Sequence, residues 1–240
     1  MLTVHVSPVG SGSVVVSVGG VVKEEPYEFV PLDDVVIEAQ GATGYRFIEW
    51  SGNMGGSTNP EHIVVNNNKD ITAHFIATET FTTSTAVEIE AGAISGTDLE
   101  LNAVDPSTIT DVAGKPDNMP YGLFDISASA NGEGRAVIRL YLPAPAPEGY
   151  RWYKYSETGG WIDFSRGKIS GGTGDGAEFN AARTEVTIYI ADNGSYDANP
   201  ADGLINDPSG LGSPTDDEEE EPTPSSDDSG GGCFIGAIIQ

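Results

Sequence analysis

Hydrophobic and polar residues alternate over much of the first 80 residues, as in strands that bury one face. Leu2, Val4 and Val6 alternate with polar residues, and the turn PVGSG (8–12) leads into the apolar run SVVVSV (13–18). We interpret these two segments as a hairpin. With further strands expected at 33–40, 45–52 and 70–77, residues 1–80 are predicted to form a small β unit.

A second β unit is expected over residues 83–212. Short apolar or alternating runs are separated there by clusters of Gly, Pro, Asn and Asp. One helical turn is expected near 105–110. Strands spaced in this way are typical of a sandwich, and we expect them at 85–91, 97–104, 122–130, 135–143, 150–156 and 184–191.

The pattern of strands ends at about residue 212. Residues 213–232 are rich in acids, Pro, Ser and Gly and lack core-forming residues, which predicts a disordered acidic linker. Residues 233–240, CFIGAIIQ, form an apolar stub, shorter than the roughly 20 residues that a membrane-spanning helix needs. The expected fold is therefore all-β: a grasp-like or sandwich-like module, then an antiparallel β-sandwich, then a disordered tail.

The net charge of the chain argues against some classes of binding partner. With 37 acidic residues against 11 Lys and Arg, the net charge is -26, so the chain should repel nucleic acid and anionic membranes. The single cysteine, Cys233, lies in the tail and gives the folded part no disulfide. The opening MLTVHVSPVG lacks the features of a signal peptide, and we interpret Met1 as the start of a fragment.

The first unit resembles a known bacterial module. VSPVGSGSV, GYRFIEWSGNMGGSTNP and DITAHF are similar to the signatures of the divergent internalin-B-type B-repeat, which occurs in tandem on bacterial surface proteins. The aromatic residues of these segments, Phe47, Trp50 and Phe75, are expected to pack together in a compact core.

The second unit resembles the choice-of-anchor U domain. The similarity is carried by MPYGLFDISASA, RAVIRLYLPAPAPEGYRWYKYSETGGWIDF and IADNGSYDANPADGLINDPSG, although Asn193, Ser195 and Ser209 replace glycines of the family pattern. The resemblance implies an extracellular bacterial module that precedes an anchor. GGGCFIG is similar to a Gly-rich C-terminal segment of exported proteins, which makes Cys233 a candidate anchoring residue; a free cysteine is the alternative.

A Gly-punctuated segment near the end of the second unit gathers hard oxygen donors of the kind that calcium prefers. Its spacing does not fit an EF-hand loop, and Asp and Asn also favour turns for their own sake. Calcium is the candidate cofactor, with candidate ligands Asp192, Asn193, Asp197, Asn199, Asp202 and Asp207.

Two aromatic residues that flank the turn SETGG, Tyr155 and Trp161, are candidate contacts for a sugar or a protein, with core packing as the alternative. His5, His62 and His74 have no nucleophile pattern beside them, so we expect no catalytic residues. Paired carboxylates on one strand, such as Glu88 and Glu90, do not by themselves make a glycosidase site.

The sequence thus predicts a non-enzymatic, extracellular or cell-surface bacterial protein of structural or adhesion type. Its tail is expected to connect it to the cell envelope, and a surface glycan or protein is the expected partner. The alternative is a carbohydrate-binding accessory module of a larger secreted protein, and a hydrolase is a third reading.

Overall fold

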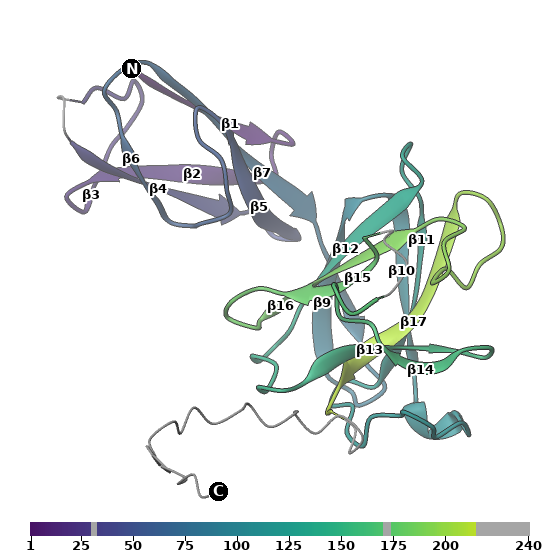
Figure 1. Ribbon diagram of the computed structural model, residues 1–240. Helices are drawn as coiled ribbons and strands as arrows, with labels where there is room; N and C mark the ends of the chain where they lie inside the picture. The colour runs from purple at the N-terminus through teal and green to yellow at the C-terminus, as the bar shows by residue number, and fades with distance from the viewer. Residues whose placement is uncertain (30–32, 170–173, 215–240) are drawn as a thin grey trace, which may run out of the picture.

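The computed structural model describes residues 1–29, 33–169 and 174–214, and over these residues the protein is all-β, as predicted (Figure 1). The only helical element among them is the 3-10 turn η1 (Pro106–Thr108), where a helical turn was expected. Asp105 caps this turn by accepting a hydrogen bond from Ser107 N at 2.8 Å. No helix in the described part is long and apolar enough to cross a bilayer.

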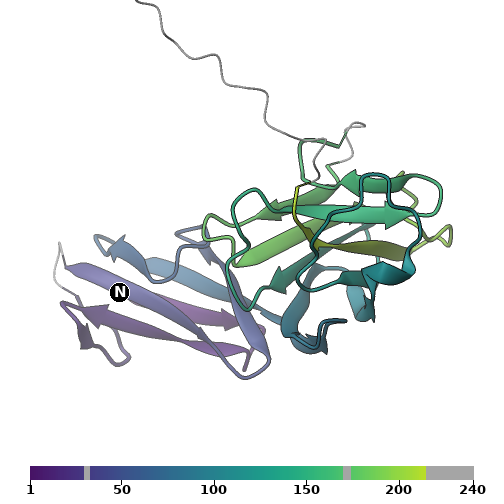
Figure 2. The same cartoon turned by 90° about the horizontal axis from the view of Figure 1, so that it is seen from below.

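The first seven strands form two sheets around one core (purple to blue in Figures 1 and 2). A three-stranded sheet has the order β1-β7-β5 and a four-stranded sheet the order β3-β2-β4-β6. The strands are β1 (Leu2–Ser7), β2 (Gly12–Val18), β3 (Val21–Val22), β4 (Asp34–Gly41), β5 (Tyr45–Gly52), β6 (Glu61–Val64) and β7 (Lys69–Ala77).

The predicted hairpin of β1 and β2 is wrong. β1 pairs with β7 in parallel, with Leu2 opposite Lys69, while β2 pairs with β3 and β4 in the other sheet. An alternating pattern identifies a strand with one buried face, but it does not show which strand lies beside it. Both β1 and β2 bury their apolar faces between the two sheets, so the pattern is the same although they lie in different sheets. Gly12 assists this packing because a Cβ there would lie 2.7 Å from the Phe75 ring of the facing sheet.

The aromatic core predicted for this unit is confirmed. The Phe47 ring lies 4.9 Å from Trp50 and 5.8 Å from Phe75, measured between ring centroids. Trp50 is 2% exposed and donates its indole N–H to Thr58 O at 2.8 Å. These aromatics therefore act in packing.

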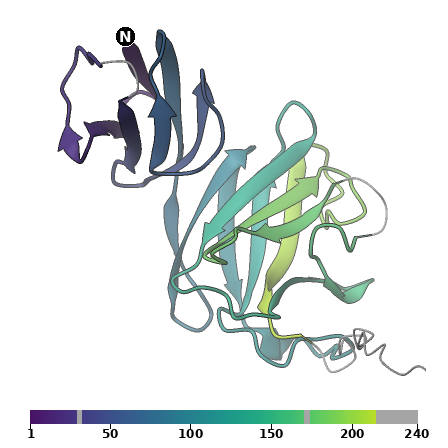
Figure 3. The same cartoon turned by 60° about the vertical axis from the view of Figure 1, so that its left-hand side comes forward.

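The remaining strands form two five-stranded sheets that enclose a second core (Figure 3). Their orders are β15-β16-β12-β9-β8 and β10-β11-β17-β13-β14. The strands are β8 (Glu79–Thr82), β9 (Glu88–Ser95), β10 (Thr97–Val104), β11 (Leu123–Ser129), β12 (Arg135–Tyr141), β13 (Arg151–Ser156), β14 (Gly160–Asp163), β15 (Gly176–Phe179), β16 (Glu185–Ala191) and β17 (Leu204–Gly212).

The sequence did not predict β17, which lies between β11 and β13. Its residues LINDPSGLG contain Asn, Asp, Pro and Gly, which argue against a central strand. Pro208 is accommodated because it pairs with Asp125 of β11, whereas pairing with β13 begins only at Ser209. Pro208 has no backbone N–H to donate, and it lies at a position where β17 pairs with β11 alone.

The two bodies touch where β7 leads into β8. Arg46 of β5 donates two hydrogen bonds to Glu90 of β9, at 2.8 and 2.9 Å, and its guanidinium lies 5.3 Å from the centre of the Tyr141 ring. Nearby, Gly92 of β9 allows the chain to pass closely, because a Cβ there would lie 2.4 Å from Ala77 O. A bidentate ion pair and a close backbone approach thus join the N-terminal body to the second one.

Candidate functional site

The segment predicted to bind calcium forms turns that its own side chains hold. Asp197 Oδ1 accepts hydrogen bonds from Asn199 N at 2.9 Å and from Asn206 N at 3.0 Å, and its Oδ2 accepts one from Asn193 N at 3.0 Å. Asp192 Oδ2 accepts one from Gly203 N at 2.9 Å. These oxygens serve the turn-forming role that Asp and Asn favour.

Two further contacts complete this segment. Asn193 Nδ2 donates to Asp202 Oδ1 at 3.1 Å, and Asn199 Oδ1 accepts from Ala201 N at 2.9 Å. Asp192 Oδ1 is buried and has no hydrogen-bond partner among the described residues. In that same part of the chain, no group of three or more His, Cys, Asp or Glu side chains is arranged to hold a metal ion.

Asp207 does not lie with the other candidate calcium ligands, which corrects its inclusion among them. It points into the core of the second body, fully buried, and accepts hydrogen bonds from Lys154 Nζ and, at 2.9 Å, from Ser209 Oγ. Lys154 was not among the residues predicted to be functional. The strand pattern could have identified it, because Lys154 is two residues after Trp152 on β13 and its side chain therefore points to the same face of the sheet.

The two aromatic candidates differ in accessibility. Trp161 is 7% exposed, donates its indole N–H to Asp111 O at 2.9 Å and packs with Leu123 and Tyr153, so its ring is not presented to a ligand. Tyr155 is half-buried, 5.1 Å from Trp161 between ring centroids. Core packing was the alternative considered for both residues, and Trp161 is packed in this way.

Tyr155 lines a pocket of about 740 Å³ on the second body. A second aromatic residue, Tyr196, lies in its wall. The wall also carries hydrogen-bonding side chains, among them Asp125, Asn206 and Asp197. Aromatic faces combined with amide and carboxylate groups can stack on a ring and bond its hydroxyls.

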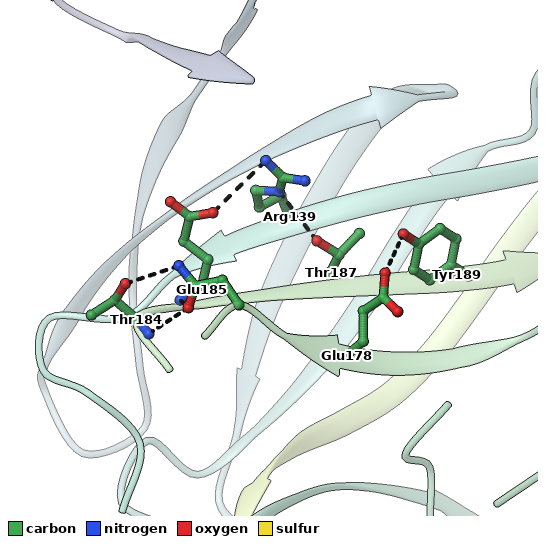
Figure 4. Close-up of polar contacts among 7 residues, drawn as sticks. Arg139, Glu178, Thr184, Glu185, Thr187 and Tyr189 are labelled. Carbon is green, nitrogen blue, oxygen red and sulfur yellow. Dashed lines mark hydrogen bonds and ion pairs between the residues drawn. The ribbon is translucent and has the colours of Figure 1, made fainter. Parts of the chain in front are cut away.

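A second pocket, of about 550 Å³, lies where the two bodies meet. Its wall on the second body is an ordered polar surface (Figure 4): Arg139 Nε donates to Thr187 Oγ1 at 3.1 Å and its guanidinium lies 3.8 Å from Glu185. Tyr189, adjacent to this wall, donates to Glu178 at 2.6 Å. Burial raises the pKa of Tyr141, another wall residue, to about 12. This tyrosine therefore stays protonated at neutral pH.

The three histidines lie apart from these pockets. His5 and His62 are exposed and pair with Asp70 at 3.2 Å and Asp34 at 2.9 Å. His74 is half-buried, and its Nε2 lies 2.6 Å from Ser51 Oγ on the neighbouring strand, a contact that the sequence did not predict. Among the described residues no carboxylate contacts the other ring nitrogen of His74, so the pair lacks the orienting third member of a catalytic triad.

Comparison with known families gives one result. Residues 2–79 match the family model of the divergent InlB B-repeat domain. The matched range covers β1 to β7, so the N-terminal body is similar in sequence to this B-repeat family, as the resemblance indicated, and this points to a bacterial surface-type protein. No curated protein and no solved structure matches the chain.

Two other expectations remain predictions. The second body was predicted to resemble the choice-of-anchor U domain, and no comparison with known proteins tests this resemblance. The acidic linker beyond residue 214 and the candidate anchoring residue Cys233 lie outside the described residues.

Proposed function

We propose that this protein is a non-enzymatic structural or adhesion-type element of a bacterial surface, in which the B-repeat and the second body are displayed from a C-terminal anchor. The match of residues 2–79 to the B-repeat family carries the proposal. The bidentate contact between Arg46 and Glu90 supports it, because two bodies held together suit a spacer better than a loose tether does.

The proposal is tested on intact source cells. An antibody raised against residues 1–80 should label unpermeabilised cells, and external protease should remove the signal. Deletion of residues 213–240, which contain the proposed anchor, should move the protein into the medium. Labelling that requires permeabilisation in both strains would overturn the surface assignment, and a deleted form that stays on the cells would overturn the anchor.

A second candidate function is carbohydrate binding at the Tyr155 pocket. It is favoured by the combination of Tyr155 and Tyr196 with polar groups in one wall. Titration calorimetry with soluble cell-wall polysaccharides should give binding that Tyr155→Ala abolishes. Tyr45→Ala, in the other pocket, is the matched control. Absence of binding by the unaltered protein would remove this candidate.

Calcium binding at the Asp192 turn is also proposed, and Asp192 Oδ1, buried without a partner, supports it. Since Asp207 is engaged with Lys154, the remaining donors are Asp192, Asp197 and their neighbours in the turn. Calcium would link the turn after β16 to the start of β17.

A further inference from the structure

Lys154 and Asp207 form a buried pair inside the second body. Lys154 Nζ donates to Asp207 Oδ1, and the two side chains are 4% and 0% exposed. They belong to the neighbouring antiparallel strands β13 and β17, where Ser209 is the direct cross-strand partner of Lys154. The backbone of a sheet therefore holds the amine against the carboxyl.

Buried aromatic rings flank the pair on its core side. The centre of the fully buried Phe164 ring lies 5.6 Å from Lys154 Nζ, and Trp152, also fully buried, shares the core-facing side of β13. Keeping two full charges in such a place carries a desolvation cost. Condensation uses the amine and the carboxylic acid, which one proton transfer from Lys154 to Asp207 supplies.

An amine held against a carboxyl group is the reactant pair for an amide. We propose that Lys154 and Asp207 condense to an intramolecular isopeptide bond between Nζ and Cγ. The Nζ lone pair attacks Cγ, the C–N bond forms and the bond from Cγ to Oδ1 breaks. Oδ1 carries away two protons that were on Nζ and leaves as water, so the reaction needs neither an oxidant nor a co-reactant.

The two oxygens of Asp207 have different surroundings that suit these roles. Oδ1 faces Nζ and is the oxygen that receives its protons. Oδ2 accepts a hydrogen bond from Ser209 Oγ at 2.9 Å, and this bond stabilises the negative charge that develops on Oδ2 in the tetrahedral intermediate. Lys154 also lines the Tyr155 pocket, which offers the released water a way out.

The product replaces two opposite charges with one neutral amide and links β13 covalently to β17. A chain closed between residues 154 and 207 has fewer unfolded conformations than an open one, so the bond stabilises the second body in the way that a disulfide does. No redox chemistry is required, and the single cysteine of the chain is not used.

Intact mass spectrometry of the denatured full chain tests the proposal. The protein should weigh one water molecule less than its sequence, and both Lys154→Arg and Asp207→Ala should restore the full sequence mass. Asp207→Asn is a sharper variant, because its amide condenses with loss of ammonia and yields the same final mass as the cross-linked parent.

Tryptic mapping locates the bond. Trypsin should fail to cleave after Lys154, and residues 152–166 should be recovered covalently joined to residues 184–240, the C-terminal tryptic peptide. Lys168, which is 54% exposed and lies 3.2 Å from Asp163, is the internal control and should be cleaved normally. A parent chain at full sequence mass with cleavage after Lys154 would overturn the proposal, as would a water loss that persists in Lys154→Arg.

Discussion

Substitution of Gly92 by alanine tests how closely the N-terminal body approaches the second body. The new Cβ would lie 2.4 Å from Ala77 O and 2.9 Å from the terminal methyl carbon of Ile76, whereas ordinary contacts begin near 3.4 Å. The methyl carbon belongs to a flexible side chain and can move, but Ala77 O is backbone. The end of β7 must therefore shift away from β9 by about an ångström.

Overpacking of this kind costs about 1–3 kcal/mol. For a chain of this size, each kcal/mol lowers Tm by about 2–4 °C. Differential scanning calorimetry of Gly92→Ala should therefore show Tm reduced by several degrees. The matched control is Gly132→Ala, because Gly132 has no positive φ and no heavy atom lies within 4 Å of the position that its new Cβ would take. Equal Tm values for the two variants would refute the close approach of β7 to β9.

The remaining predictions concern the interface, the aromatic cluster and the acidic turn. A double-mutant cycle of Arg46→Ala and Glu90→Ala, followed by urea unfolding, should give a coupling free energy of at most about 1 kcal/mol, because both side chains are partly exposed; a coupling of zero would show that the contact does not join the bodies. The hydrogen bond from Arg46 lowers the pKa of Glu90, so this coupling should be present above the ordinary glutamate pKa and disappear as the pH falls through the lowered value; a coupling unchanged under strongly acidic conditions would contradict this. Trp161→Ala should lower the free energy of unfolding by about 3–5 kcal/mol, and a variant as stable as the parent would show that the ring is not packed. If calcium binds at the Asp192 turn, EDTA lowers Tm and Asp192→Asn removes that effect; a melt insensitive to EDTA in the parent would end the calcium proposal.

Alternation and turn residues predicted the strands that obey simple rules. LTVHVS and RAVIRLYLP were identified because one of their faces is apolar at every second position, and β1 and β12 are found there. The strand that pairs with β1 was predicted wrongly. It is β7, more than 60 residues away, and an alternating pattern contains no information about which distant segment pairs with a strand.

The candidate site was predicted less well, for a related reason. Asp207 was grouped with the acidic turn because it is near it in sequence, yet its side chain is committed to Lys154, 53 residues earlier. Trp161 was considered as a ligand contact, but the segment around η1 brings Asp111 over its indole and buries it. In each case, a long-range contact decided which of two plausible roles the side chain has.

The place of β17 in its sheet sets the order in which the second body can fold. β13 and β14 pair with each other, as do β10 and β11, and β17 alone joins these two pairs. β17 is also the last strand among the described residues. The sheet cannot close, and the core that it covers cannot be sealed, until the residues up to Gly212 have been synthesised. Because β17 pairs with strands made much earlier, closing this sheet is a late step in the folding of the second body.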